Sequence, residues 1–372
     1  MIKKALETVL EIDLGALAHN YRILRSKIGK DVKLMAVVKA FAYGSDANEI
    51  AEKLSELGVD YFAVAYISEG IALREVGIEK PILVFHPQST NFESIIEYCM
   101  EPSIYSEFVL NEFIKTAEKL GQKEYPIHLK LNTGLNRLGF DENELDLVSN
   151  SLSKTKAVKV KGVYSHLAAS EDWREREFTL QQINKFRKMA FKIIQFLPSR
   201  PLLHLCNTSG IFNYPEASFD MVRSGIGLYG FGNDPEIDKH LKPIGTLKTI
   251  ISQIHEVGKG ESIGYNRAFK TSEKMTIATL PIGYADGISR QYGNEKAGVF
   301  IKGNYAPIIG NVCMDMLMID ITGIDCKEGD EVILFGGPQP APDFAENGKT
   351  ISYELITGIS QRVKRRIIPE KY

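Results

Sequence analysis

Residues 34–44 read LMAVVKAFAYG, a short apolar run that ends in Lys39 and is followed by an aromatic-glycine turn. An apolar run of this length before a turn predicts a strand buried on both faces, as in a parallel sheet. Lys39 is therefore expected at the rim of the core. Partial desolvation lowers the pKa of a lysine amine and makes it a nucleophile for carbonyl groups. The alternative is an amine that leaves the strand end and reaches water.

The same pattern recurs between about residues 10 and 240, where short apolar runs alternate with amphipathic helical segments. Strands that alternate with helices predict a parallel sheet, and eight such strands are the number that closes a (β/α)8 barrel. The expected strands are 34–39, 61–66, 81–85, 103–105, 126–132, 160–166, 202–207 and 221–229. Helices are expected at 14–28, 47–57, 92–99, 107–120 and 176–196.

After about residue 240 the helical patterns give way to β-rich runs. Asp286-Gly287, Gly303-Asn304 and Gly336-Gly337 mark turns among them. We therefore predict an α/β protein with an N-terminal (β/α)8 TIM barrel at residues 1–240 and a C-terminal antiparallel β domain at residues 241–372. The expected strands of the second domain are 247–257, 275–280, 298–302, 306–309, 316–321 and 331–335.

The composition excludes several classes of partner. Apolar residues make up 44% and charged residues 25% of the chain, which is typical of a soluble globular protein. A net charge of −2 gives no electrostatic basis for binding nucleic acid or an anionic membrane. The sequence has neither a long apolar run nor a signal-peptide pattern. Its four cysteines are widely spaced, which argues against a metal site or a disulfide framework and favours a reducing cytoplasm.

Chemically capable residues gather at one end of the predicted barrel. The active site of such a barrel lies at the carboxyl ends of its strands. Taken singly, each of these residues also has an ordinary explanation as a core histidine, a rim ion pair or a helix cap. The glycines of 224–227 permit either phosphate binding or tight strand packing. The strand ends, in order, carry Lys39, the 132–137 turn, His166, Asn207-Thr208 and Arg223.

These motifs resemble those of the alanine racemase family, the fold type III enzymes that use pyridoxal 5′-phosphate. The segment 36–44, AVVKAFAYG, is similar to the family's cofactor-lysine motif, and 131–140, LNTGLNRLGF, is similar to its substrate-arginine turn. Further matches occur in family order from residue 9 to about residue 366. They are 164–166, 204–207, 222–226, 264–265, 283–287, 313–315 and 351–354.

The resemblance implies an isomerase that interconverts L-alanine and D-alanine and supplies D-alanine for peptidoglycan. Inversion at the α-carbon requires a base on each face, and the α-proton is acidic enough only with an electron-withdrawing cofactor. By resemblance, Lys39 holds the cofactor and handles the D-amino acid's proton, and Tyr265 handles the L-amino acid's proton. A tyrosine has a pKa near 10, so His166 and Arg223 are expected to supply positive charge around it.

The resemblance also implies roles for the remaining site residues. Arg223 should face the pyridine nitrogen, and because a guanidinium keeps its proton, that nitrogen should stay unprotonated. Arg137 and the backbone N–H of Met314 should bind the substrate carboxylate. The expected cofactor ligands are Lys39, Tyr43, His166, Asn207, Thr208, Arg223, Gly225, Ile226 and Tyr353. The substrate-binding group also includes Tyr265, Cys313 and Asp315. The substrate entryway is expected at Tyr284, Tyr353, Glu171 and Arg290.

Several positions depart from the family pattern. Asn132 stands where aspartate is common, and Leu135 where methionine is common. Asn311 replaces an entryway arginine, and Glu171 replaces an entryway aspartate. Lys130 matches a lysine that is often carbamylated, although an unmodified lysine is the simpler expectation. Substrate range is therefore less sharply predicted than the core chemistry.

Tyr265 and Met314 belong to the predicted β domain, and in the family such residues reach the site from the partner subunit. The resemblance thus implies a homodimer with composite active sites, in line with the prevalence of symmetric dimers. It also implies that residues 1–12 pack with the β domain. The alternatives are a broader racemase for serine or basic amino acids, a decarboxylase of the same architecture, and a non-catalytic cofactor carrier. Tyr265 argues against the decarboxylase, and the β domain argues against a barrel-only carrier.

Overall fold

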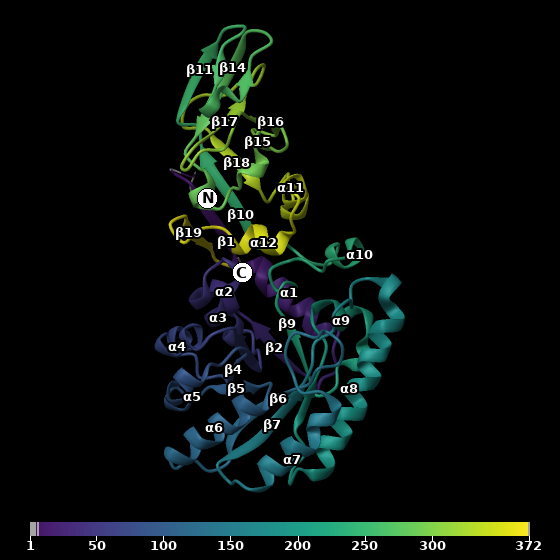
Figure 1. Cartoon of the computed structure of the whole chain (residues 1–372). Helices are drawn as coiled ribbons and strands as arrows, with labels where there is room; N and C mark the ends of the chain where they lie inside the picture. The colour runs from purple at the N-terminus through teal and green to yellow at the C-terminus, as the bar shows by residue number, and fades with distance from the viewer. Residues whose placement is uncertain (1–4, 6, 371–372) are drawn as a thin grey trace. The chain divides into compact units, whose positions relative to one another are not determined.

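The computed structural model describes residue 5 and residues 7–370 (Figure 1). Residues 1–4, 6, 371 and 372, which fall within the segments predicted as 1–12 and 241–372, lie outside the described residues. The chain forms two units. The barrel unit comprises 17–42 and 47–242, and the β unit comprises the described residues of 1–16, 43–46 and 243–372.

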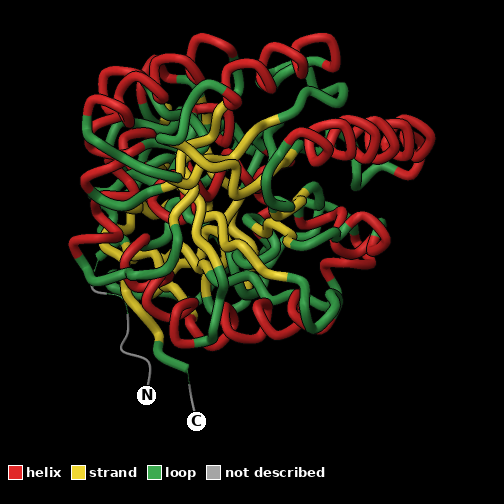
Figure 2. Tube along the Cα trace, turned by 90° about the horizontal axis from the view of Figure 1, so that it is seen from below, coloured by secondary structure: helices red, strands yellow, loops and turns green. Residues whose placement is uncertain are grey.

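The barrel unit confirms the predicted TIM barrel. Among the described residues, eight parallel strands pair in sequence order and close on themselves. Figure 2 shows strands gathered inside a ring of helices. Each strand lies within or overlaps one of the predicted apolar runs, as expected for the short, largely buried strands of a parallel sheet. The strands are β2 (Lys33–Val37), β3 (Tyr61–Val64), β4 (Ile82–Val84), β5 (Glu101–Ile104), β6 (Tyr125–Lys130), β7 (Val158–Tyr164), β8 (Leu202–His204) and β9 (Met221–Ser224).

Helices alternate with the strands, and the longer ones bury an apolar face. In α6, for example, the buried residues recur at helical spacing, from Val109 and Leu110 to Phe113, Ile114 and Ala117. None of the helices in the described residues is both long enough and apolar enough to span a membrane. The helices are α1 (Leu14–Ser26), α3 (Ala47–Glu56), α4 (Ile67–Glu75), α5 (Phe92–Glu97), α6 (Glu107–Lys119), α7 (Leu145–Ser153), α8 (Arg176–Phe196), α9 (Thr208–Asn213) and α10 (Pro235–Asp238).

The β unit is built on a sheet that has nine strands in the described part of the chain. Most neighbours are antiparallel, as predicted. At one edge of the sheet, β1 and β19 pair in parallel; these strands come from opposite ends of the chain, so the long connection that a parallel pair requires is present. In order across the sheet, the strands are β11 (Gln253–Val257), β14 (Met275–Leu280), β17 (Leu317–Asp320), β16 (Asn304–Ile309), β15 (Gly298–Ile301), β18 (Glu331–Phe335), β10 (Gly245–Ile250), β1 (Val9–Asp13) and β19 (Lys364–Ile368).

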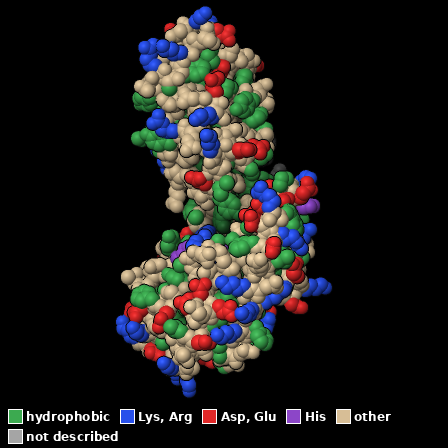
Figure 3. All heavy atoms as spheres, turned by 45° about the vertical axis from the view of Figure 1, so that its right-hand side comes forward, with side chains coloured by type: hydrophobic (Ala, Val, Ile, Leu, Met, Phe, Trp, Pro, Cys, Tyr) green, Lys and Arg blue, Asp and Glu red, His purple; other side chains and the backbone are tan. Residues whose placement is uncertain are grey.

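Smaller elements complete the β unit. The run 247–257, expected as one strand, is split into β10 and β11, because the chain changes neighbours from β18 to β14 between them. A short ribbon joins β12 (Ser262–Ile263) to β13 (Phe269–Lys270). Two helices, α11 (Ala341–Asn347) and α12 (Ser352–Thr357), precede β19. Acidic and basic side chains are interspersed on the face drawn in Figure 3, in keeping with the small net charge.

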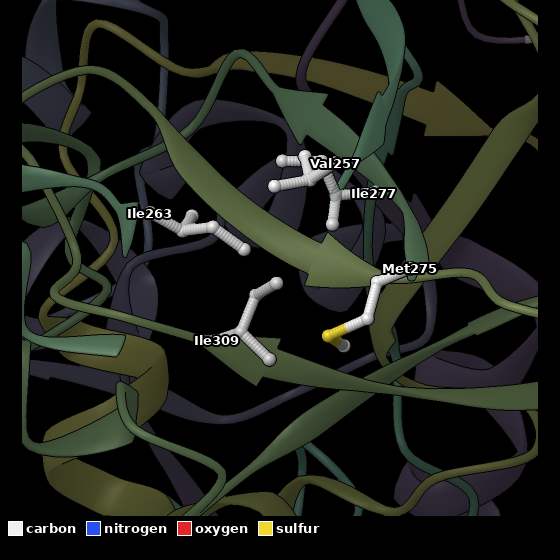
Figure 4. Close-up of a cluster of buried hydrophobic side chains, with 5 residues drawn as sticks. All are labelled: Val257, Ile263, Met275, Ile277 and Ile309. Carbon is white, nitrogen blue, oxygen red and sulfur yellow. The ribbon is translucent and has the colours of Figure 1, made fainter. Parts of the chain in front are cut away.

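A cluster of five buried apolar side chains supports the loop that carries Tyr265. Val257, Ile263, Met275, Ile277 and Ile309 converge from β11, β12, β14 and β16 (Figure 4). Phe269 and Met318 pack against this cluster. Ile263 immediately precedes the Gly264-Tyr265 step, so this core fixes the point at which the loop leaves the sheet.

Candidate active site

Lys39 stands at the carboxyl end of β2, half-buried, and begins an unusual turn. The segment labelled α2 in Figure 1 (Lys39–Tyr43) has the opposite hand to an ordinary helix. Residues 40–43, none of them glycine, have φ angles of 54°, 55°, 51° and 54°. A left-handed conformation costs an L-residue about 1–2 kcal/mol. Strain of this kind persists where surrounding contacts enforce it, and it concentrates at functional sites. The sequence predicted a turn here but not its hand.

The far end of this turn belongs to the β unit, where it is tightly held. Gly44 has a φ of +79°, and a side chain there would collide with the carbonyl oxygen of Ile356 in α12. Arg365 donates from Nη2 to the carbonyl oxygen of Gly44 at 2.7 Å and from Nε to that of Ser45 at 3.1 Å. These contacts fix residues 43–46 against α12. Close approach of backbone to backbone explains why glycine occupies position 44.

Tyr43 and Tyr353, both predicted phosphate ligands, lie together in the β unit. Their ring centroids are 6.2 Å apart. Burial, followed by the proximity of Tyr353, raises the pKa of Tyr43 above its ordinary value. The Tyr43 phenol therefore keeps its proton across the physiological range.

Arg223 is a buried cation of the barrel unit that is held by several contacts. It lies on β9, almost fully buried, and donates from Nη2 to the carbonyl oxygens of Ser165 at 2.6 Å and Leu205 at 3.1 Å. The same guanidinium reaches Nδ1 of His204 at 3.0 Å and Nδ1 of His166 at 3.2 Å. Burial lowers its pKa to about 10, which still leaves it charged at neutral pH. It is thus a fixed positive donor.

His166 and His204 are neutral partners of this arginine. Burial first, and then the charge of Arg223, holds the pKa of both imidazoles well below the ordinary value. Because an arginine only donates, each histidine must accept at Nδ1 and carry its proton on Nε2. The prediction that His166 adds positive charge is therefore wrong. Among His166, His204 and Arg223, only Arg223 is charged.

This tautomer extends a chain of hydrogen bonds into the barrel. Nε2 of His204 lies 3.1 Å from Nδ1 of His128, and Nε2 of His128 lies 2.6 Å from Oε2 of Glu101. Since His204 must donate from Nε2, His128 accepts at Nδ1 and in turn donates from Nε2 to the Glu101 carboxylate. Sequence reasoning missed Glu101 and His128. Their signal was an ionisable residue inside a short strand, Glu101 at the start of β5 and His128 in the middle of β6.

Lys130 ends β6 in the same buried layer. Its amine lies 5.0 Å from the ring centroid of Tyr164, and Cζ of Arg223 lies 5.2 Å from that centroid. The Tyr164 ring stacks on His204 at 4.7 Å. Burial, followed by the charges of Arg223, Arg137 and Lys39, lowers the pKa of Lys130 to about 7. In a large fraction of the protein molecules, the Lys130 amine is therefore unprotonated at neutral pH.

Lys39 faces the same group of cations. Burial lowers the pKa of its amine, Arg137 lowers it further, and Glu69 raises it. Arg137 is itself exposed on the turn that follows β6. Its charge also lowers the pKa of Lys130 and His166. The structure therefore brings together Lys39, Lys130, Arg137, His166 and Arg223.

Asn132 shapes the turn that presents Arg137. Its Oδ1 accepts the backbone N–H groups of Gly134 at 3.2 Å and Asn136 at 3.1 Å. Its amide nitrogen donates to Oδ1 of Asn136 and to Oδ1 of Asp141, each at 3.0 Å. An asparagine serves this turn because it offers both an acceptor and a donor. This geometry gives a physical reason for the departure from aspartate at position 132.

The glycine-rich segment after β9 forms a close cradle with the start of α9. Oγ1 of Thr208 lies 3.1 Å from Oγ of Ser224 and accepts the N–H of Gly227 at 3.2 Å. A Cβ atom at Gly227 would lie 2.6 Å from Cγ2 of Thr208, so glycine is required there. Gly225 and Ile226 lie in the adjoining buried turn, where their carbonyl oxygens accept the N–H groups of the third residue along. Hydroxyl and glycine-backbone groups in such a cradle are typical of phosphate binding.

Asn207 acts as a helix cap. Its Oδ1 accepts the N–H of Gly210 at 2.9 Å and the hydroxyl of Ser170 at 2.7 Å. The sequence left capping open as an alternative role for this residue. By capping α9, Asn207 orients Thr208 toward the cradle.

These groups fit pyridoxal phosphate. The aldehyde requires an unprotonated amine, which the lowered pKa of Lys39 favours. The ring nitrogen requires a fixed donor, which Arg223 provides, and the phosphate requires hydroxyl and backbone donors, which surround Thr208 and Gly227. The donor set of the barrel unit therefore matches the chemistry of the cofactor.

The β unit holds the second group of predicted residues. Tyr265, Cys313, Met314 and Asp315 line one groove of about 790 Å³. The Tyr265 side chain is 75% exposed and that of Met314 is 53% exposed, so neither is committed to the core of this unit. Asn311 donates to the carbonyl oxygen of Tyr265 at 3.2 Å and so steadies its backbone.

Tyr284 is attached to this groove through the backbone. Its N–H donates to the carbonyl oxygen of Cys313, and the N–H of Ala285 donates to that of Met314, both at 3.0 Å. Arg290 is exposed nearby, where its charge acts on Cys313. Glu171, by contrast, lies half-buried in the barrel unit, in the loop between β7 and α8. The predicted entryway residues thus fall in different units.

Arg362 is a residue that sequence reasoning missed. It donates from Nε to Oδ1 of Asp286 at 2.7 Å and from Nη2 to Oδ1 of Asp315 at 2.6 Å. Asp286 is buried, and its Oδ2 accepts the N–H of Gly283 at 2.8 Å. Asp286-Gly287 is therefore not a simple hairpin turn, because Asp286 and Arg362 tie the 283–287 and 313–315 loops together.

Known proteins match the chain over nearly its whole length. The family model described as the alanine racemase N-terminal domain matches residues 12–233, and the one described as the C-terminal domain matches residues 244–367. Alanine racemase 2 of Caldanaerobacter subterraneus subsp. tengcongensis is 37% identical over 368 residues, which covers 96% of this chain and 94% of the relative.

Solved structures agree with this assignment. The alanine racemase of Clostridium difficile 630 superimposes with a TM-score of 0.92 at 34% identity, covering 99% of this chain and 97% of that one. A structure of alanine racemase from Bartonella henselae with covalently bound pyridoxal phosphate superimposes with a TM-score of 0.89 at 30% identity, covering 98% of this chain and 100% of that one.

Proposed function

The chain belongs to the alanine racemase family, and from this premise we propose that it interconverts L-alanine and D-alanine with pyridoxal phosphate as cofactor. The observation that carries the proposal is the cluster at the carboxyl ends of the barrel strands, where Lys39, an amine of lowered pKa, lies among Arg137 and His166, and where Arg223 is held against His166 and His204. When bound, the cofactor withdraws electrons from the substrate α-carbon and makes its proton removable.

The residues that hold the cofactor follow from this cluster. Lys39 binds it covalently, and Arg223 donates to its ring nitrogen. Because Arg223 stays protonated, it supplies a hydrogen bond without giving up a proton. Its contacts to Ser165 and Leu205 support a single orientation of the guanidinium. The phosphate-binding set is Tyr43, Asn207, Thr208, Gly225, Ile226 and Tyr353.

Two bases then move the α-proton. The Lys39 amine acts on the face from which the D-enantiomer loses its proton, and the Tyr265 phenol acts on the opposite face. Burial of Lys39 supports the first role, because it favours the unprotonated amine. In the proposed composite site, Arg223 would supply the positive charge for Tyr265, since His166 is neutral. A cation stabilises the phenolate and makes the tyrosine a competent base.

Substrate binding completes the proposal. Arg137 and the backbone N–H of Met314 bind the substrate carboxylate, with Cys313 and Asp315 beside them. Exposed Tyr265 and Met314 support a homodimer in which the β unit of one subunit completes the barrel site of the other, because both side chains stand on a surface available to a partner. The entryway is formed by Tyr284, Tyr353, Glu171 and Arg290.

Carbamylation of Lys130 belongs to the same proposal. The nitrogen of an unprotonated lysine adds to carbon dioxide and releases one proton, which converts a buried neutral amine into an anion. A pKa of about 7 supports this step, because it provides the unprotonated amine. The resulting carbamate would face Arg137 and Arg223, whose charges already act on Lys130. A D-alanine supply for peptidoglycan and a cytoplasmic location complete the proposed role.

Chiral analysis of the purified, cofactor-loaded protein tests the function. The protein is incubated separately with L-alanine, L-serine and L-lysine. We expect equal amounts of the two alanine enantiomers and much slower turnover of the other substrates. Equal turnover of serine or lysine would replace the proposal with a broader racemase. If none of the three substrates is inverted, a decarboxylase or a cofactor carrier takes its place.

A further inference from the structure

Glu69 connects two neighbouring β/α units of the barrel through one carboxylate. It lies in the first turn of α4, and its Oε2 accepts the N–H groups of Ala65 at 2.7 Å and Tyr66 at 3.1 Å. A glutamate at this position often caps its own helix in this way. Its other oxygen makes a hydrogen bond that capping of α4 does not require. Oε1 accepts the N–H of Ala40 at 2.6 Å, which joins α4 to the turn after β2.

Ala40 is the residue in which the left-handed run begins. It directly follows Lys39, and its φ and ψ angles are 54° and 53°. The peptide unit that carries its N–H is therefore the one that sets the direction in which Lys39 leaves the strand. A hydrogen bond to an ionised carboxylate is among the stronger ones that a backbone N–H can donate. Glu69 thus restrains Lys39 by binding the peptide unit that joins Lys39 to Ala40.

The carboxylate also has an electrostatic effect on Lys39. The cations that face this amine are Arg137, from the turn after β6, and Lys130, from the end of β6. His86 and His166 face it as well, and the pKa of each is lowered, so both are neutral. Glu69 supplies charge of the opposite sign from α4.

We propose that Glu69 is a positioning residue for Lys39, which clamps the backbone of the left-handed turn with one oxygen and places a negative charge against the cations around the amine. The proposal deepens the function proposed above and rests on it only in treating Lys39 as the cofactor lysine. This role requires no contact between Glu69 and the substrate or cofactor. Glu69 acts through the Lys39 main chain and through the charge balance at its amine.

The bland alternative is that Glu69 merely caps α4. Glu144 offers a matched comparison in the same barrel unit. It also accepts the N–H of its own cap residue, Asp141, at 2.7 Å. Glu69→Gln and Glu144→Gln therefore remove the same charge from the same kind of cap. A glutamine at 69 has one acceptor oxygen in place of two, so it cannot satisfy both Ala40 and Ala65.

The test uses hydrogen exchange in the holoenzyme and trace acetylation of the full-length protein after removal of cofactor. In E69Q we expect the Ala40 amide to exchange at least about ten-fold faster. We also expect the pKa of the Lys39 amine to fall, which raises its acetylation at pH 7 several-fold relative to exposed Lys119. In E144Q both quantities should match the wild type. Glu69→Asp keeps the charge and shortens the reach, so it should speed exchange at Ala40 while the amine pKa stays close to wild type.

The outcomes separate the two readings. If E69Q changes exchange only in the first turn of α4, and Ala40 exchange and Lys39 acetylation stay as in wild type, Glu69 is a helix cap and the proposal is overturned. If E69Q does not fold, E69D alone decides, because unchanged exchange at Ala40 in that variant also overturns it. Neither readout uses racemase activity. A protein that fails to invert alanine but shows both changes would therefore lose the proposed function and keep this inference.

Discussion

Nη1 of Arg223 lies 3.0 Å from Nδ1 of His204, and this contact determines the proton positions of two histidines. An arginine cannot accept, so His204 accepts here and donates through Nε2 to His128. His128 then donates to Glu101 at 2.6 Å. A charged group at the proposed cofactor site is thus connected, with one fixed polarity, to a carboxylate deep in the barrel. This series of hydrogen bonds holds the Arg223 guanidinium in place and links it to the distant carboxylate of Glu101.

Replacing Glu101 with leucine should destabilise the protein and leave the proton positions undefined. His128 is fully buried, and without the carboxylate its Nε2–H has no acceptor in this chain of bonds. We expect the free energy of unfolding to fall by about 2–4 kcal/mol in urea titrations. Exposed Glu118, replaced in the same way, should change it by less than about 0.5 kcal/mol.

Nitrogen-15 NMR of histidine-labelled protein reads the same chain directly. In the wild type, His204 and His128 should both appear as neutral rings protonated at Nε2. In the Glu101→Leu variant, the His128 signal should lose this single form. A wild-type His204 protonated at Nδ1 would contradict the assigned polarity.

The Asn132→Asp substitution, although it restores a residue common in the family, should impair this protein. The Asn132 amide nitrogen donates to Oδ1 of Asp141 at 3.0 Å, so an aspartate would place two carboxylates in contact. The turn that presents Arg137 should open. We expect KM for alanine to rise about ten-fold, equivalent to about 1.4 kcal/mol, with a smaller change in kcat.

The double variant Asn132→Asp with Asp141→Asn supplies the control. It restores a donor and an acceptor across the contact, and KM should return to within about three-fold of wild type. Rescue by the double variant is the decisive result. If the second substitution makes KM worse, charge repulsion is not the cause of the defect.

Lys130 should make stability depend on pH in a defined window. Its pKa falls from 10.5 to about 7 on folding, so between these values the unfolded chain binds a proton that the folded chain does not. Stability must then rise with pH, by up to about 1.4 kcal/mol per pH unit. In buffer free of carbon dioxide, Lys130→Met should remove this slope and stabilise the protein most below pH 7. Half-exposed Lys159, replaced by methionine, should leave the slope intact.

The fold was largely predictable because most of the barrel strands are short, largely buried and rich in apolar residues. The strands β1 and β19 were not predicted, since they carry charges that normally signal surface. Their charges are neutralised inside the sheet, where Lys248 lies 3.0 Å from Oε2 of Glu11 and Arg366 lies 3.4 Å from Oε1. Partners this far apart in sequence leave no local pattern.

The site was predictable where a motif lies in one stretch and unpredictable where it depends on distant contacts. Lys39 and Arg137 stand in motifs that can be read residue by residue. The left-handed run at residues 40–43 contains no glycine that would indicate this conformation in the sequence. It is held in part by Glu69 from the next β/α unit. The neutral state of His166 likewise follows from burial beside Arg223, which only the folded chain provides.

Removing the Tyr265 hydroxyl should abolish racemisation without disturbing the fold. The side chain is 75% exposed, so Tyr265→Phe should change the free energy of unfolding by less than about 0.5 kcal/mol. Loss of a positioned general base should lower kcat about 10²–10⁴-fold in chiral assays. Cofactor absorbance should persist, because Lys39 is untouched. Tyr305, which is 51% exposed in the same unit, provides the matched phenylalanine control and should retain full activity. Full activity in the Tyr265 variant would show that another group serves the second face and would refute the two-base assignment.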